Sequence, residues 1–343
     1  MVNASRASRQ NVDNPTTRDG VEEPATATRP EPPTATRPEP PTSTRPDPAA
    51  TTRPDIATPL ITWFRQEARD LPWRRPGFPA WGTLVSEIML QQTQVARVIP
   101  RLEAWLTRWP TPADLADSPP ADAVRAWDRL GYPRRALALH AAATAIAEQH
   151  GNVVPRDVDA LLALPGIGDY TARAVAVFAY GDRHPVVDVN VRRVLARALL
   201  GQGEPGPAKA KQDLPLMESV LPADRDDAAV TNAAVMELGA LVCVARSPAC
   251  DACPIADRCA WRAAGYPEHE GPRAPKQAKF AGSDRQVRGL IMAELRASDV
   301  PVTRDEIEPV WPDAEQRERA LASLLRDGLA EGDDASGYSL PEG

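Results

Sequence analysis

The stretch Leu164-Pro165-Gly166-Ile167-Gly168 constrains the fold most, because it interrupts a pattern that is otherwise helical on both sides. The flanking segments, VDALLA and DYTARAVAVFAY, carry apolar residues at helical spacing. The sequence therefore predicts two helices joined by a tight turn. The first backbone N–H groups of the second helix favour an anion, and the missing β-carbons at Gly166 and Gly168 let a phosphate come close.

The region from residue 58 to residue 262 reads as all-α. Further apolar segments of helical period end at breaks such as Gln91-Gln92-Thr93 and Gly131-Tyr132-Pro133, and no sustained strand-like alternation is present. The sequence predicts that Thr93 caps the helix after the first break. Tyr170, just after the glycine turn, is expected to be exposed.

Three other segments flank this region. Residues 1–57 repeat Thr-Arg-Pro-Glu/Asp every eight residues and are poor in apolar side chains, which predicts a disordered tail. Residues 263–280 form a predicted linker. Residues 281–343 are expected to form a small winged-helix-like module of three helices and a hairpin.

The net charge of −7 is unevenly distributed. The segment 281–343 holds 7 Lys and Arg against 14 Asp and Glu, so the remainder of the chain is neutral overall. The central region can therefore still present a basic face to nucleic acid, whereas the acidic C-terminal segment is a poor DNA ligand. No long apolar run or secretory signal is found, and we expect a cytoplasmic protein with no membrane contact.

The four cysteines of the chain form one motif. Cys243, Cys250, Cys253 and Cys259 follow the spacing C-x6-C-x2-C-x5-C. Four thiolates in so short a segment can hold one metal centre, and the ligand type alone allows either zinc or an iron–sulfur cluster. A pair of structural disulfides is disfavoured in the expected reducing compartment.

The chain resembles the endonuclease III superfamily of helix-hairpin-helix DNA glycosylases, and within it the adenine DNA glycosylases of the MutY type. The Leu-Pro-Gly-Ile-Gly turn and the cysteine spacing carry the first resemblance. LPWR (71–74), VSEIMLQQTQVARVIP (85–100), LGY (130–132), VVDVNVRRVLAR (186–197) and MELGALVC (236–243) carry the second. The resemblance implies two helical lobes, a 4Fe–4S cluster on the four cysteines, and double-stranded DNA containing A:8-oxoguanine or A:G mispairs as the partner. It also favours a monomer that is associated with the nucleoid through DNA.

Removal of adenine requires an acid for the base and a carboxylate for the sugar cation. Glu87 stands in an apolar run, where burial favours the protonated form, and the resemblance makes it the proton donor. The resemblance makes Asp188 the partner of the sugar cation and of the attacking water, with Asn190 supporting it. Asp188 can also be a simple helix cap. Relatives that cut the strand carry a lysine at position 170, so Tyr170 implies a monofunctional enzyme.

The resemblance places other residues at the DNA. Gln91 or Gln92 could fill the gap left by the flipped adenine, and Tyr132 matches a residue that wedges beside the opposite base. Arg74 and Glu237 match positions near the adenine pocket. For each of these, an ordinary structural role is an equal alternative.

Two other functions compete with this one: an endonuclease III-like glycosylase for damaged pyrimidines, and a DNA-binding protein without activity. Tyr170 and MLQQTQV argue against the first, and the pair of Glu87 and Asp188 argues against the second. The chain also departs from the MutY type, because residues 281–343 do not resemble the Nudix-like domain that recognises 8-oxoguanine there.

Overall fold

The computed structural model describes residues 54–271 and 279–343. The predicted tail therefore lies almost wholly outside the described residues, as does part of the predicted linker. The described chain is helical with one short hairpin, which confirms the all-α prediction. No described helix is long and apolar enough to cross a membrane.

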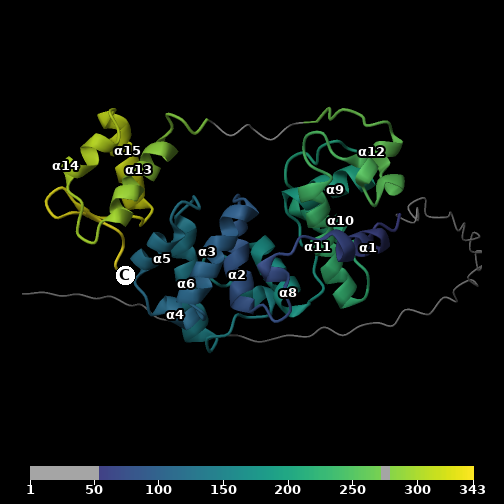
Figure 1. Cartoon of the computed structure of the whole chain (residues 1–343), viewed down its shortest axis with the longest axis horizontal. Coiled ribbons are helices and arrows are strands. Elements are labelled where there is room, and N and C mark those ends of the chain that lie inside the picture. Colours follow the sequence, from purple (N-terminus) through teal and green to yellow (C-terminus); the bar gives the residue numbers. More distant parts are fainter. Residues whose placement is uncertain (1–53, 272–278) are drawn as a thin grey trace, which may run out of the picture. The chain divides into compact units, whose positions relative to one another are not determined.

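One group of helices packs around α2 (Figure 1). Its core is aliphatic, with the indole rings of Trp105, Trp109 and Trp127 in edge-to-face contact. The helices of this group are α2 (Ala80–Leu90), α3 (Val95–Arg108), α4 (Pro112–Ala116), α5 (Pro120–Trp127), α6 (Arg134–Gln149), α7 (Val158–Leu162) and α8 (Asp169–Tyr180).

A second core forms where α1 and α9 pack on α11. Ile56, which precedes α1, is 1% exposed in this core, so ordered packing begins slightly before the predicted boundary at residue 58. The elements of this group are α1 (Ala57–Glu67), α9 (Val189–Leu200), α10 (Ala210–Glu218), α11 (Arg225–Leu241) and α12 (Ala260–Ala263), with the short 3-10 helices η2 (Cys250–Ala252) and η3 (Ala256–Arg258) in the cysteine loop. The 3-10 helix η1 (Pro72–Arg74) follows α1.

The C-terminal segment contains the predicted helices and hairpin. They are α13 (Asp284–Ala297), α14 (Arg304–Ile307), the 3-10 helix η4 (Glu308–Val310), α15 (Ala314–Arg326), β1 (Glu331–Asp333) and β2 (Gly337–Ser339). The two strands are antiparallel, with Gly332 opposite Tyr338.

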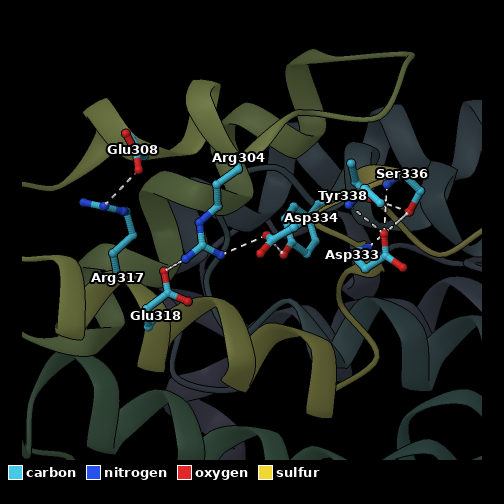
Figure 2. A network of polar contacts seen from close by, with 10 residues as sticks. Arg304, Glu308, Arg317, Glu318, Asp333, Asp334, Ser336 and Tyr338 are labelled. Carbon is cyan, nitrogen blue, oxygen red and sulfur yellow. Dashed lines mark hydrogen bonds and ion pairs between the residues drawn. The ribbon is translucent and has the colours of Figure 1, made fainter.

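A polar network ties the hairpin of this segment to its helices. Figure 2 shows Arg304 between Glu318 on α15 and Asp334 in the hairpin turn. The Tyr338 hydroxyl donates to the same Asp334 carboxylate at 2.6 Å. Much of the acidic charge here is therefore engaged within the segment, with an arginine at the centre of the network.

The break before α3 differs from its prediction. Thr93 does not cap α3, because the helix begins one residue later and Gln94 occupies the N-cap position. The Thr93 hydroxyl instead lies 3.3 Å from the carbonyl oxygens of Gln91 and Leu130. It therefore joins two turns that are distant in the sequence.

Candidate active site

Glu87 is a buried acid. It lies on α2, whose buried residues are mostly apolar, and it is only 6% exposed. Burial raises the pKa of the Glu87 carboxyl from 4.5 to about 7, a hydrogen bond from Tyr170 partly opposes this, and the nearby charge of Asp188 adds to it. Glu87 can therefore hold a proton near neutral pH, as a general acid must.

Tyr170 lies against this acid. It is the second residue of α8, and its hydroxyl donates to Glu87 Oε2 at 3.0 Å. Burial and the charges of Glu87 and Asp188 hold the pKa of Tyr170 well above its ordinary value, so the phenol remains a donor. The expectation of an exposed Tyr170 is wrong: the side chain is half-buried, because its partner stands on α2, which is distant in the sequence.

Asp188 is both a helix cap and a candidate carboxylate for the reaction. It is the N-cap of α9, and its Oδ1 accepts from the backbone N–H of Val191 at 2.7 Å. Its Oδ2 accepts from Asn190 Nδ2 at 2.8 Å. Burial raises the pKa of Asp188, while these two hydrogen bonds act in the opposite direction. The predicted support of Asp188 by Asn190 is thus present as a direct contact.

Arg193, which the sequence analysis did not single out, hydrogen-bonds the residues around Asn190. Its Nη2 donates to Asn190 Oδ1 at 2.8 Å and to the Gly239 carbonyl at 2.6 Å, and its Nε donates to the Cys243 carbonyl at 2.7 Å. The spacing of three residues from Asn190 to Arg193, one helical turn, was the available signal. Through Arg193, the residue that supports Asp188 is joined to the start of the cysteine loop.

Gly239 makes this arrangement possible. A β-carbon at this position would lie 2.7 Å from the β-carbon of Asn190. Only glycine lets α11 approach the first turn of α9 so closely. The glycine of MELGALVC therefore has a packing role against Asn190, the partner of Asp188.

The four cysteines line one small cavity. Cys243, Cys250, Cys253 and Cys259 surround it together with apolar side chains that include Leu238 and Ile255. Four thiol side chains around one cavity are a donor set that suits a structural zinc ion or an iron–sulfur cluster.

The cavity also offers the environment that such a cluster needs. Burial raises the pKa of the Cys253 thiol to about 11, so this sulfur stays protonated near neutral pH unless a metal centre binds it. Arg197 Nη1 lies 3.3 Å from Cys243 Sγ and also donates to the Val244 carbonyl at 2.8 Å. A cationic hydrogen-bond donor at the ligand sulfur stabilises the thiolate form and fixes the loop.

The glycine turn connects α7 and α8 as predicted. Gly166 has a φ of +72°, and a β-carbon there would lie 2.6 Å from the β-carbon of Ala138 on α6. Gly168 is the N-cap of α8, and the space where its β-carbon would stand is open. The backbone that precedes α8 is therefore unobstructed at Gly168, and Tyr170 follows two residues later.

Glu237 and Arg74 contact each other. Glu237 is 1% exposed, and its Oε2 accepts from Arg74 Nη2 at 2.9 Å and from Arg69 Nη2 at 2.7 Å. Burial would raise the pKa of Glu237, but the hydrogen bonds from the two arginines outweigh it and lower the pKa to about 2. Glu237 is therefore an anion, and Arg69 is a partner that the sequence analysis missed.

Gln91, Gln92 and Tyr132 lie on two turns. Gln91 follows α2, and its Nε2 is 3.4 Å from Thr171 Oγ1 on α8. Gln92 is exposed, and the Tyr132 side chain is 44% exposed. Gln92 and Tyr132 are therefore exposed, in contrast to the buried Glu87.

Two family models match the chain. The HhH-GPD superfamily of base excision DNA repair proteins matches residues 85–218, and the iron-sulfur binding domain of endonuclease III matches residues 243–259. The second match covers all four cysteines. Together with the fitting cavity, it shows that these residues are the ligands of a 4Fe–4S cluster.

Relatives match most of the chain. An adenine DNA glycosylase of Mycobacterium tuberculosis (strain H37Rv) is 51% identical over 285 residues, which cover 83% of this chain and 93% of that protein. One of Mycolicibacterium smegmatis is 54% identical over 273 residues, covering 79% and 91%. The human adenine DNA glycosylase is 39% identical over 213 residues, covering 58% and 38%.

Solved structures agree on the fold. A thermostable thymine-DNA glycosylase superposes with a TM-score of 0.54 at 25% identity, covering 61% of this chain and 95% of that one. A non-covalent endonuclease III–DNA complex gives a TM-score of 0.52 at 21% identity, covering 61% and 94%, which shows the fold alone. By its helices, its cysteine loop and its relatives, the chain belongs to the adenine DNA glycosylase family of the HhH-GPD base excision repair superfamily.

Proposed function

We propose that this chain is a monofunctional adenine DNA glycosylase that removes adenine mispaired with 8-oxoguanine or guanine. The observation that carries the proposal is the contrast between two carboxyl groups. Glu87 is buried with a pKa of about 7, whereas Asp188 is held by two hydrogen bonds at the start of α9. One group can give up a proton while the other carries a charge.

The reaction breaks the bond between the adenine nitrogen and the sugar carbon. Adenine is a poor leaving group as an anion, so Glu87 donates its proton to the base as the bond breaks. The sugar then develops positive charge, which the Asp188 carboxylate stabilises. Water adds to the sugar carbon, Asp188 takes up its proton, and an abasic site remains.

Tyr170 supports the monofunctional part of the proposal. Strand cleavage in this superfamily requires an amine that forms a Schiff base with the sugar. Tyr170 supplies a phenol at the corresponding position, and burial keeps that phenol protonated. The residue hydrogen-bonds the acid and forms no covalent bond with the sugar.

The DNA contact follows from the glycine turn. Double-stranded DNA presents its phosphates to the open backbone at Gly168 and to the first N–H groups of α8. The adenine leaves the base stack to reach Glu87, at a cost of about a few kcal/mol. Gln91 or Gln92 fills the gap, Tyr132 stands beside the opposite base, and Arg74 and Glu237 border the adenine. We propose that the protein acts as a monomer.

Assays on defined duplexes test the function. The protein is incubated with DNA carrying A:8-oxoguanine, A:G or thymine glycol, and release of the base is followed under single-turnover conditions. We expect release of adenine from the first two and no reaction with the third. Cleavage at thymine glycol without adenine release would instead identify a pyrimidine glycosylase, and binding without any release a non-enzymatic protein.

Glu87→Gln tests the acid. The substitution removes the acidic proton but keeps the shape and the contact with Tyr170. Adenine release should fall about 10²- to 10⁴-fold, the usual contribution of general acid catalysis, while affinity for the duplex is retained. Glu103→Gln, an exposed glutamate on α3, is the matched control and should leave release unchanged. Near-normal release by Glu87→Gln would refute the assignment.

A further inference from the structure

Two exposed turns have backbones that need outside support. Gln92, after α2, has a φ of +56°, and Tyr132, between α5 and α6, has a φ of +50°. Residues with a side chain rarely adopt this left-handed region, and they persist there only where the surrounding structure holds them. In the proposed function these are the two turns that enter the DNA.

Arg135 contacts both turns with one guanidinium group. Its Nη1 donates to the Ile88 carbonyl in the last turn of α2 at 3.1 Å, and to the carbonyl of Gln91, which follows the helix. Its Nη2 donates to the Gly131 carbonyl at 3.2 Å, immediately before Tyr132. The planar fork therefore joins the C-terminal end of the helix that carries Glu87 to the turn that carries Tyr132.

Aromatic packing holds this fork in place. The guanidinium carbon lies 5.0 Å from the centre of the Tyr132 ring and 5.7 Å from that of Trp127. Arg135 Nε is buried without a hydrogen-bond partner. A buried donor without an acceptor is costly, so the site is not optimised for stability alone. A lysine at this position could not make the same set of hydrogen bonds, because its ammonium group is compact and lacks the planar arrangement of donors of a guanidinium group.

We infer that Arg135 is a positioning residue that fixes the Gln92 turn and the Tyr132 turn relative to each other. Insertion of the Tyr132 side chain beside the opposite base and extrusion of the adenine are therefore coupled. The Thr93 hydroxyl, 3.3 Å from the Gln91 and Leu130 carbonyl oxygens, strengthens the same connection. This inference rests on the proposed function and adds a residue that touches neither the base nor the sugar.

The test compares paired and unpaired adenine. Arg135→Lys is assayed under single-turnover conditions on a duplex with A:8-oxoguanine and on the same strand with the adenine in a three-nucleotide bubble. In the bubble the base is already unstacked, so coupled insertion is not needed. We expect release from the duplex to fall about 10- to 100-fold, the scale of a misplacement near 1 Å, and release from the bubble to stay close to the wild-type rate.

Arg134→Lys is the control, since this neighbouring arginine has a side chain that is 69% exposed. It should leave both rates unchanged. If Arg135→Lys lowers the rate of adenine release equally on both substrates, or on neither, the inference is overturned. A wild-type protein that releases no adenine from any substrate would count against the proposed function instead.

A second measurement does not depend on the folding of Arg135 variants. Gln92→Ala, Tyr132→Ala and the double variant form a mutant cycle in the wild-type background, read by single-turnover release from the duplex. If the Arg135 guanidinium group couples the two turns, the effects of the two substitutions on the rate of adenine release are not additive. Additive effects would contradict the coupling.

Discussion

At the scale of single residues, the contact between Glu87 and Tyr170 is central to the proposed chemistry. The phenol donates to the carboxyl at 3.0 Å and lowers its pKa, while burial raises it more strongly. The balance leaves an acid that titrates close to neutral pH. Each side chain therefore has a measurable effect on the other.

The pH dependence of adenine release should report this balance. Release requires protonated Glu87, so the single-turnover rate should decline as the pH rises through about 7. Tyr170→Phe removes the hydrogen bond that lowers the pKa of Glu87, and the decline should move to higher pH. A pH–rate series of both proteins on A:8-oxoguanine measures the shift. An unchanged midpoint would exclude Glu87 as the titrating group.

Glu87 should also lower the stability of the protein in alkaline solution. A carboxyl whose pKa rises from 4.5 to about 7 on folding opposes folding by about 3 kcal/mol once it is charged. The native state loses this stability as the pH rises from about 4.5 to about 7. Glu87→Gln should therefore unfold at higher denaturant concentration than wild type at pH 8, and the difference should vanish near pH 4. Equal stability at pH 8 would mean that the carboxyl is not desolvated.

Tyr170→Lys tests the absence of strand cleavage. Wild type should leave the strand intact until alkali is added, and borohydride should trap little adduct. The lysine places an amine beside Glu87, so trapping and some nicking should appear. Pairing with the ammonium would keep Glu87 ionised and slow adenine release. Gels without alkali decide the matter, and efficient nicking by wild type would show that another amine acts.

At the scale of elements, the contact of α9 with α11 positions the Asp188 carboxylate. Asp188 caps α9, Asn190 lies in its first turn, and Gly239 allows α11 to lie against that turn. Arg193 closes the contact by donating to Asn190 Oδ1 and to the Gly239 carbonyl. The precision of the site therefore depends on a helix pair rather than on a flexible loop.

Gly239→Ala should disturb catalysis more than folding. The added methyl group would lie 2.7 Å from the Asn190 β-carbon, so the start of α9 must move. Adenine release should fall about 100-fold for a displacement near 1 Å, with a stability loss of about 1–3 kcal/mol. Gly289→Ala on α13 has open space and is the matched control, expected to be neutral or slightly stabilising. Similar rates for the two variants would remove the packing argument.

The sequence predicted what depends on local pattern and failed where distant side chains meet. Glu87 is recognisable because its neighbours on α2 are apolar, and Asp188 because it precedes a helix. The prediction that Tyr170 is exposed was wrong because its hydrogen-bond partner, Glu87, lies on another helix. The roles of Arg135 and Arg193 were not predicted, because an arginine in a helical sequence pattern is expected to face solvent. Only the tertiary structure shows which carbonyl groups each arginine contacts.

At the scale of the whole molecule, chemistry and acidity lie in different parts of the chain. The proposed acid, the proposed carboxylate, the glycine turn and the cysteines all lie between residues 87 and 259. The segment from residue 281 has twice as many acidic as basic residues, and several of its arginines are engaged in ion pairs such as Arg304 with Glu318 (Figure 2). Its charge argues against a direct phosphate contact.

Removal of this segment should leave the reaction intact. A chain ending at Lys279 keeps every proposed site residue and all four cysteines. We expect a brown protein that retains iron and releases adenine from an A:G duplex at a rate close to that of the full chain. Iron content, absorbance and single-turnover release check this. A soluble, iron-loaded fragment without activity would show that the segment completes the enzyme.

The close approach of Gly166 to Ala138 limits which sequences this enzyme can reach by mutation. The backbone at Gly166 is left-handed, and a β-carbon there would lie 2.6 Å from the methyl group of Ala138. Gly166 cannot gain a β-carbon without pushing the glycine turn away from α6, and the turn carries the helix of Tyr170. Substitution of Gly166 is therefore strongly disfavoured, whereas Gly168, with open space in front of it, can vary wherever the approach of DNA permits.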